Sequence, residues 1–211
     1  MKIKKLVVGP LQANCYVVWD KDGGSAAIID PGGDPEEIIS VVDDEKLKPV
    51  VLINTHGHID HIAANRAIKE RYDIPLLIHR EDSASLTDPE LNLSAMGFGQ
   101  LDSPPSDREL QDGDEIPVGE IMLKVISTPG HTPGGICLLI SRSDQPDVII
   151  TGDTLFAGGV GRTDFPGGSW DLLMESIRNR LLSFPDETII LPGHGPHSTI
   201  GEERKSNPFL T

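Results

Sequence analysis

Short apolar runs alternate with segments of helical periodicity along this chain. Runs of strand length at 2–8, 14–19 and 26–30 are separated by the turn residues Gly9-Pro10 and Asp22-Gly23-Gly24. The same criteria predict further strands at 50–54, 74–78, 114–118, 121–127, 135–140, 147–151 and 188–191. Helical segments are predicted at about 36–46, 62–72, 79–85, 169–182 and 201–206. No linker interrupts this order, which suggests one domain over residues 1–211, with two sheets packed face to face and helices outside.

The clearest helical segment is 169–182. Ser169 is the expected N-cap residue, because its hydroxyl can accept a hydrogen bond from a free backbone N–H of the first turn. Trp170, Leu173, Ile177 and Leu181 fall on one face of this helix, which predicts a buried stripe.

Residues 86–108 follow neither the helical nor the strand period. A loop of this length in a compact domain is usually functional or disordered. We interpret the segment as a mobile cover over a site, and the alternative is an ordinary surface excursion.

The balance of charged residues limits which kinds of partner this chain is expected to bind. There are 18 Lys and Arg residues against 33 Asp and Glu residues, and the formal net charge is −15. Such a chain on average repels nucleic acid and anionic membranes, so we expect neither as a partner. An anionic small-molecule substrate would need a local basic pocket. The oligomeric state is left open by these features.

The two cysteines, Cys15 and Cys137, lie in apolar runs far apart in the sequence. There is no C-x-x-C pair, so we interpret both as buried reduced thiols, which favours a cytoplasmic location. The apolar run at the N-terminus is too short for a signal peptide. No window approaches the roughly 20 apolar residues of a membrane span.

Four potential metal ligands fall within six residues directly after the predicted strand at 50–54. The segment reads Thr55-His56-Gly57-His58-Ile59-Asp60-His61. In an extended chain His56 and His58 project to the same side, whereas Asp60 and His61 lie where the backbone turns into the next helix. The alternative is a polar loop with surface histidines. We interpret the corner as a metal site that can serve two neighbouring cations.

Three more candidate ligands also follow predicted strands, and each is preceded by glycine. They are His131, Asp153 and His194. Loops held by a rigid sheet are common positions for ligands, although any one of these residues alone could be an ordinary loop residue. The remaining histidines, His79 and His197, have no matching ligand role, and we leave both out of the site.

Together these motifs resemble the metallo-β-lactamase superfamily, and more narrowly the glyoxalase II-like hydrolases of the single-domain bacterial type. The motifs are Thr-His-Gly-His-Ile-Asp-His, Thr-Pro-Gly-His-Thr-Pro-Gly, Thr-Gly-Asp-Thr-Leu-Phe and Pro-Gly-His-Gly. The resemblance implies an α+β fold, the αββα sandwich of two mixed sheets, with no C-terminal helical substrate domain. It also implies a first metal held by His56, His58 and His131 and a second by Asp60, His61 and His194. Asp153 would bridge both.

The expected chemistry is hydrolysis. Nitrogen and oxygen donors suit two divalent ions, Zn²⁺ foremost, with Fe and Mn as alternatives. A water shared between two such ions loses its proton near neutral pH, and the hydroxide can attack a carbonyl that one metal polarises. We expect Asp60 to act with this metal-bound hydroxide as a catalytic residue.

The resemblance implies a thioester substrate of the S-D-lactoylglutathione kind. Arg162 fits the basic position that holds glutathione in this family, and its alternative role is a salt bridge with Asp164. Asp164 stands where the family has a tyrosine, which puts glutathione recognition in doubt.

Rival functions remain open at this point. The Gly-Arg-Thr-Asp-Phe segment is also similar to one in persulfide dioxygenases, which bind a single iron through positions matching His56, His131 and Asp153. The same motifs would also fit a hydrolase of a different ester or of a lactone. A non-catalytic metal-binding domain is disfavoured, because a complete set of ligands is typical of a catalytic site.

Overall fold

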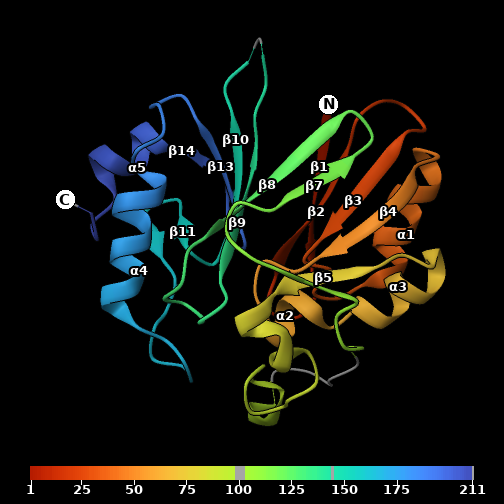
Figure 1. The fold of residues 1–211 in the computed structure, drawn as a ribbon, viewed down its shortest axis with the longest axis horizontal. Helices are drawn as coiled ribbons and strands as arrows, with labels where there is room; N and C mark the ends of the chain where they lie inside the picture. Colours follow the sequence, from red (N-terminus) through yellow and green to blue (C-terminus); the bar gives the residue numbers. More distant parts are fainter. Residues whose placement is uncertain (98–102, 144, 211) are drawn as a thin grey trace.

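Two six-stranded mixed sheets pack face to face, and helices cover the outer face of each (Figure 1). The computed structural model describes residues 1–97, 103–143 and 145–210. This arrangement is the αββα sandwich that the sequence predicts. No helix in the described part of the chain is long and apolar enough to cross a membrane.

The first sheet comes from the N-terminal half of the chain. In order across the sheet, its strands are β1 (Lys2–Val8), β2 (Ala13–Trp19), β3 (Ser25–Ile29), β4 (Lys48–Ile53), β5 (Leu76–His79) and β6 (Arg108–Leu110). β1, β2 and β3 are antiparallel neighbours, whereas β3 through β6 run parallel. Helices α1 (Pro35–Asp44) and α3 (Asn65–Tyr72) make the parallel crossovers and cover the outer face.

The second sheet comes from the C-terminal half. In order across the sheet, its strands are β14 (Ser198–Thr199), β13 (Ile189–Pro192), β10 (Val148–Gly152), β9 (Ile136–Ile140), β8 (Ile121–Ser127) and β7 (Glu115–Val118). β13 runs parallel to β10, and the other neighbours are antiparallel. Helices α4 (Trp170–Ser176) and α5 (Ile200–Ser206) cover its outer face.

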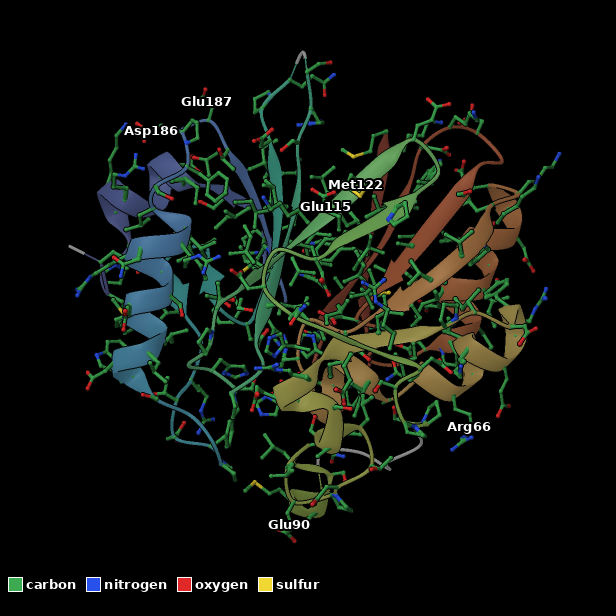
Figure 2. The ribbon with its side chains drawn as sticks, viewed as in Figure 1. Arg66, Glu90, Glu115, Met122, Asp186 and Glu187 are labelled. Atoms are coloured by element: carbon green, nitrogen blue, oxygen red, sulfur yellow. The ribbon has the colours of Figure 1, made fainter. Side chains whose placement is uncertain are left out.

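Strand alternation explains the layered core. Successive side chains of a strand point to opposite faces, so β2 sends Tyr16 and Val18 between the sheets and Cys15 and Val17 toward the helices. Side chains from both sheets fill the space between them, while charged residues such as Glu90 and Asp186 lie on the surface (Figure 2). Both cysteines are fully buried and free, as the sequence predicts.

The predicted helices need three corrections. The segment predicted at 62–72 begins earlier, as the short helix α2 (Ile59–Ile62), and continues as α3. The segment at 169–182 has Ser169 as its N-cap but changes after α4 into the π-helical η3 (Ile177–Leu181). Trp170 is 45% exposed and packs edge to face on Phe209 instead of on the sheet. The other three residues of the predicted stripe are fully buried.

Several short elements were not predicted from the sequence. They are β6, β14, the small hairpin β11 (Leu155–Phe156) with β12 (Gly159–Val160), and the 3₁₀ turn η2 (Ser94–Met96). Strands of two or three residues show no periodicity of their own. β5 begins at Leu76 instead of at residue 74, since Pro75 has no N–H to donate to the sheet.

The described parts of segment 86–108 contact the rest of the protein. The Asn92 side chain donates to the carbonyl of Ser85 at 2.7 Å, and the Asn92 carbonyl accepts from the N–H of Ile59 at 2.8 Å. Leu93 is buried. Residues 98–102 lie outside the described residues, and motion of the segment stays a prediction.

Candidate metal centre

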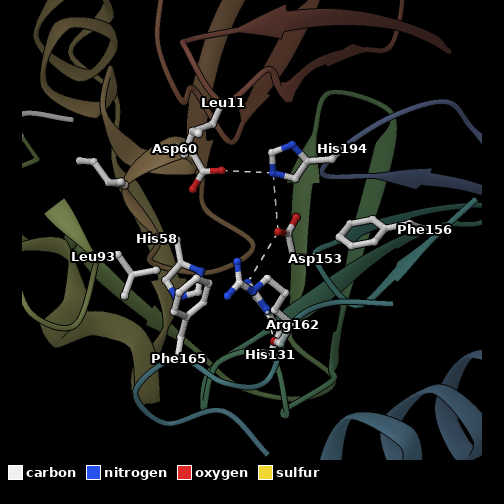
Figure 3. A pocket seen from close by; sticks show the side chains of 11 residues that line it. Leu11, His58, Asp60, Leu93, His131, Asp153, Phe156, Arg162, Phe165 and His194 are labelled. Carbon is white, nitrogen blue, oxygen red and sulfur yellow. Dashed lines mark hydrogen bonds and ion pairs between the residues drawn. The ribbon is translucent and has the colours of Figure 1, made fainter. Parts of the chain in front are cut away.

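Strand ends from both sheets bring the predicted ligands to one edge of the sandwich. β8, β10 and β13 point the same way in the second sheet, so the loops that follow them meet at one end. These loops carry His131, Asp153 and His194. The loop after β4, from the opposite sheet, adds His56 and His58, and α2 adds Asp60 and His61. Figure 3 shows five of these side chains around a common space.

All seven predicted ligands belong to three overlapping groups. Within each group one donor atom from every residue lies within 4.8 Å of the others. The groups are His56, His58 and His131; His56, His61 and Asp153; and Asp60, His61 and His194. Asp153 lies between the two ends of the cluster, 3.6 Å from His131 Nε2 and 3.7 Å from His194 Nε2.

Five polar atoms at the centre lack hydrogen-bond partners among the described residues. The Nε2 atoms of four histidines and Oδ1 of Asp153 are buried without a partner among the described residues; the histidines are His56, His58, His61 and His131. Buried polar atoms in proteins are almost always hydrogen-bonded. Five such atoms directed into one space therefore fit divalent cations, since imidazole and carboxylate are both suitable donors.

The other nitrogen of three rings is engaged by the surrounding protein. His131 Nδ1 donates to the carbonyl of Arg162 at 2.7 Å. His56 Nδ1 lies 3.2 Å from Thr55 Oγ1, and His61 Nδ1 lies 3.1 Å from Asp30 Oδ2. Contacts of this kind fix ring orientation and tautomer in metal sites. They leave Nε2 as the atom presented to the centre.

Burial and neighbouring charges prepare the ligands for a cation. Burial, followed by the neighbouring histidines, lowers the pKa of His56 well below its usual value and that of His58 to about 3. Both rings are therefore neutral at pH 7. Burial opposes protonation of His61 too, but the carboxylates of Asp60 and Asp153 outweigh it and raise the His61 pKa to about 10. These carboxylates create a negative environment that a bound cation would neutralise.

Asp60 remains ionised in this environment. Burial works to raise its pKa, but His61 and His194 hold the pKa below its ordinary value. His194 Nε2 lies 3.1 Å from Asp60 Oδ2.

Two buried carboxylates that sequence reasoning missed hold the ligand loops in place. Asp30 accepts from the N–H and the hydroxyl of Thr55 at 2.7 and 2.6 Å. Asp82, in the 3₁₀ helix η1 (Arg80–Leu86), accepts from Thr132 Oγ1 at 2.7 Å and from the N–H of Gly134 at 2.6 Å. It also accepts from the N–H of Gly57 at 3.2 Å. Asp30 could have been recognised from the sequence, because it follows β3 directly, as the metal ligands follow their strands. The sequence around Asp82 has no comparable feature.

One glycine before a ligand is required by a close approach. A Cβ at Gly193 would collide with the carboxylate of Asp153 and would lie 2.8 Å from the His61 ring. Backbone therefore passes directly beside the centre at this point, which agrees with the expectation from the sequence.

A pocket of about 310 Å³ opens onto the cluster. Its apolar lining comes from Leu11, Ile59, Leu93, Phe156 and Phe165. Arg162 is its only lysine or arginine among the described residues (Figure 3). A volume at the lower end of the usual range suits a small-molecule ligand.

The Arg162 side chain makes two contacts at the pocket. Its guanidinium binds Asp164 through two hydrogen bonds, of 2.9 and 2.8 Å, so the salt bridge considered for Arg162 from the sequence is formed. It also lies over the ring of Phe165, 4.3 Å from the centroid.

The two excluded histidines lie outside the cluster. His79 accepts from the N–H of Glu81 at 3.3 Å at the start of η1, and its Nε2 lies 3.3 Å from Ser127 Oγ. His197 is exposed.

Comparison with known proteins shows close relatives along the whole chain. The model of the metallo-beta-lactamase superfamily matches residues 8–194. A Bacillus subtilis protein named probable metallo-hydrolase YqgX is 37% identical, with 100% of this chain and 98% of that protein covered. The hydroxyacylglutathione hydrolase GloC of Haemophilus influenzae is 39% identical, with the same coverage.

Solved structures agree with this similarity. The crystal structure of the B3 metallo-beta-lactamase BLEG-1 is 39% identical over 100% of both chains, with a TM-score of 0.93. The structure of TTHA1623 in a di-iron-bound form is 35% identical over 98% of this chain and all of that chain, with a TM-score of 0.87.

Proposed function

The chain belongs to the metallo-beta-lactamase superfamily, and from this premise we propose a dinuclear metal-dependent hydrolase that cleaves an acyl thioester. The favoured substrate is an S-(2-hydroxyacyl)glutathione such as S-D-lactoylglutathione. The relatives named as metallo-hydrolases support hydrolysis as the reaction class, and the GloC relative supports this substrate. Two Zn²⁺ ions are the proposed cofactors, with Fe or Mn as alternatives.

The observation that carries the proposal is the set of buried donor atoms, unpartnered among the described residues, in the cluster onto which the pocket opens. One ion would be held by His56, His58 and His131, and the second by Asp60, His61 and His194. Asp153 would be a ligand shared by both. The relative solved with two iron ions supports a two-metal interpretation of the cluster, whereas its metal differs from the zinc proposed here.

Two bound divalent ions would lower the pKa of a shared water and polarise the thioester carbonyl. The chain supplies the remaining parts of the reaction. The ionised carboxylate of Asp60 lines the pocket, and in this proposal it accepts a hydrogen bond from the attacking water and orients it. The apolar walls exclude bulk water around the acyl group. In the net reaction the water oxygen joins the acyl carbon, the carbon–sulfur bond breaks, and the thiolate takes up a proton.

Arg162 is the proposed binding residue for the thiol part of the substrate. It lies at the pocket and offers a guanidinium to a carboxylate. Its backbone carbonyl also accepts from the ring of His131, so the same segment borders substrate and metal ligand.

The main rival function is an iron persulfide dioxygenase that uses His56, His131 and Asp153 alone. A second rival is a hydrolase of a different ester or of a lactone.

The test is hydrolysis of S-D-lactoylglutathione by purified protein, followed by loss of thioester absorbance. The protein is assayed after metal removal and after loading with Zn²⁺, Mn²⁺ or Fe²⁺. We expect turnover at about 1 s⁻¹ or more with one of these metals, within the ordinary range of enzyme rates. Absence of turnover by every loaded form would refute the proposal, and oxygen uptake with a persulfide would then test the dioxygenase.

A further inference from the structure

The only lysine or arginine of the described pocket lining is already engaged by a carboxylate. Asp164 Oδ1 accepts from Arg162 Nε at 2.9 Å, and Oδ2 accepts from one terminal nitrogen at 2.8 Å. These two nitrogens form a fork, one of the two edges with which arginine can bind a carboxylate through parallel hydrogen bonds. The other terminal nitrogen makes no hydrogen bond to any described residue. Arg162 thus keeps only its end-on edge, between the two terminal nitrogens, for a ligand, and its charge is already paired with Asp164.

This ion pair contributes little to stability. The Arg162 and Asp164 side chains are 65% and 66% exposed. Exposed pairs of this kind are screened by solvent and typically add little to the free energy of unfolding. A purely structural role therefore gives a weak account of a carboxylate paired with an arginine that lines the pocket.

The guanidinium is also restricted in its orientation. It lies over the ring of Phe165, and that ring packs edge to face on His58 at 5.7 Å. The backbone of Arg162 is fixed by the hydrogen bond from His131. A ligand that binds the Nε edge of this guanidinium must therefore displace Asp164.

From this geometry we infer that Asp164 is a specificity-determining residue that competes with the substrate for Arg162. The site then binds a carboxylate of the thiol weakly, through the end-on edge of a guanidinium that is already paired, and discriminates against thiols with strong negative charge. The inference rests on the proposed thioesterase. It identifies the negative charge of the leaving thiol as the property by which the enzyme selects its substrate.

The test compares two thioesters that share the D-lactoyl group. S-D-lactoylglutathione has carboxylates on its thiol, whereas S-D-lactoyl-N-acetylcysteamine has none. In Asp164→Asn the fork of Arg162 becomes free for the carboxylate. We expect the ratio of kcat/KM values, glutathione thioester over cysteamine thioester, to rise about two- to fivefold, the range of an exposed ion pair. The Kd of S-methylglutathione, which cannot be hydrolysed, should fall by the same factor.

Two controls separate the fork from a change in overall charge. Glu120→Gln removes one negative charge from another exposed pair, with Lys21, and should leave the ratio unchanged. In the Arg162→Met background, Asp164→Asn should also leave it unchanged, because the fork is gone. The gain should shrink between 0.05 and 1 M salt, since exposed charges are screened over about 3 Å at 1 M.

The outcomes distinguish this inference from the proposed function. Hydrolysis of both thioesters with an unchanged ratio and an unchanged Kd in Asp164→Asn overturns the role of Asp164 and leaves the thioesterase standing. A gain that persists in the Arg162→Met background also overturns it. No hydrolysis of either thioester, together with tighter S-methylglutathione binding in Asp164→Asn, overturns the thioesterase and supports the role of Asp164.

Discussion

Asp82→Asn tests whether a carboxylate outside the ligand set holds the metal centre together. The Asp82 side chain is buried and joins two ligand loops that come from different sheets. It accepts from Gly57, between His56 and His58, and from Thr132 and Gly134, beside His131. An asparagine keeps the shape but replaces one acceptor oxygen with a donor NH₂ group, which cannot accept from those loops.

The magnitude follows from the lost acceptor. At least one of the three buried donors is left without a partner, which costs about 1–3 kcal/mol in the free energy of unfolding. For a chain of this length 1 kcal/mol shifts the Tm by about 2–4 °C, so metal-free Asp82→Asn should unfold about 2–12 °C below the native protein. Loosening of the loops should also weaken one of two zinc sites by about 10- to 100-fold, the usual effect of losing an outer partner.

The assays are thermal unfolding by circular dichroism and zinc titration by calorimetry against a competing chelator. Asp44→Asn makes the same chemical change at an exposed position of α1 and should stay within about 0.5 kcal/mol of the native protein. If Asp82→Asn matches Asp44→Asn in both Tm and zinc affinity, Asp82 does not support the centre and our reasoning is wrong.

Three further predictions concern the metals and the thiols. His58→Ala and Asp60→Ala should each reduce thioester kcat at least about 100-fold, which is more than the loss of an outer partner causes. Native rates in both variants would show that the assigned two-metal ligand set is wrong. Metal present at 100 times its Kd stabilises the folded protein by about 2.7 kcal/mol. Removal of this metal with a chelator should therefore lower the Tm by about 5–11 °C. Iodoacetamide at pH 8 should modify neither Cys15 nor Cys137 in the folded protein and leave activity intact. Burial raises both pKa values, that of Cys137 to about 11, so the thiols stay protonated at that pH; labelling of either one in the native state, detected by mass spectrometry, would contradict this.

Much of the fold was predictable because its signals are local. Apolar runs such as 121–127 and the turn residues between them mark the strands, and Ser169 marks the start of α4. The short strands were not predictable from the sequence. β6 and β14 form only because a longer strand lies beside them, and the exposure of Trp170 depends on tertiary contacts that the helical period does not encode.

The sequence alone determined which residues could bind metal, since His56, His58, Asp60 and His61 form one local motif and the other ligands follow strand ends. Only the tertiary structure decided that all seven lie together and that their Nε2 and carboxylate atoms share one space. It alone placed Asp82 between the ligand loops and Asp164 on the fork of Arg162. The physical reason is that strand order and loop direction depend on packing between distant parts of the chain, whereas the choice of ligand chemistry lies in each residue itself.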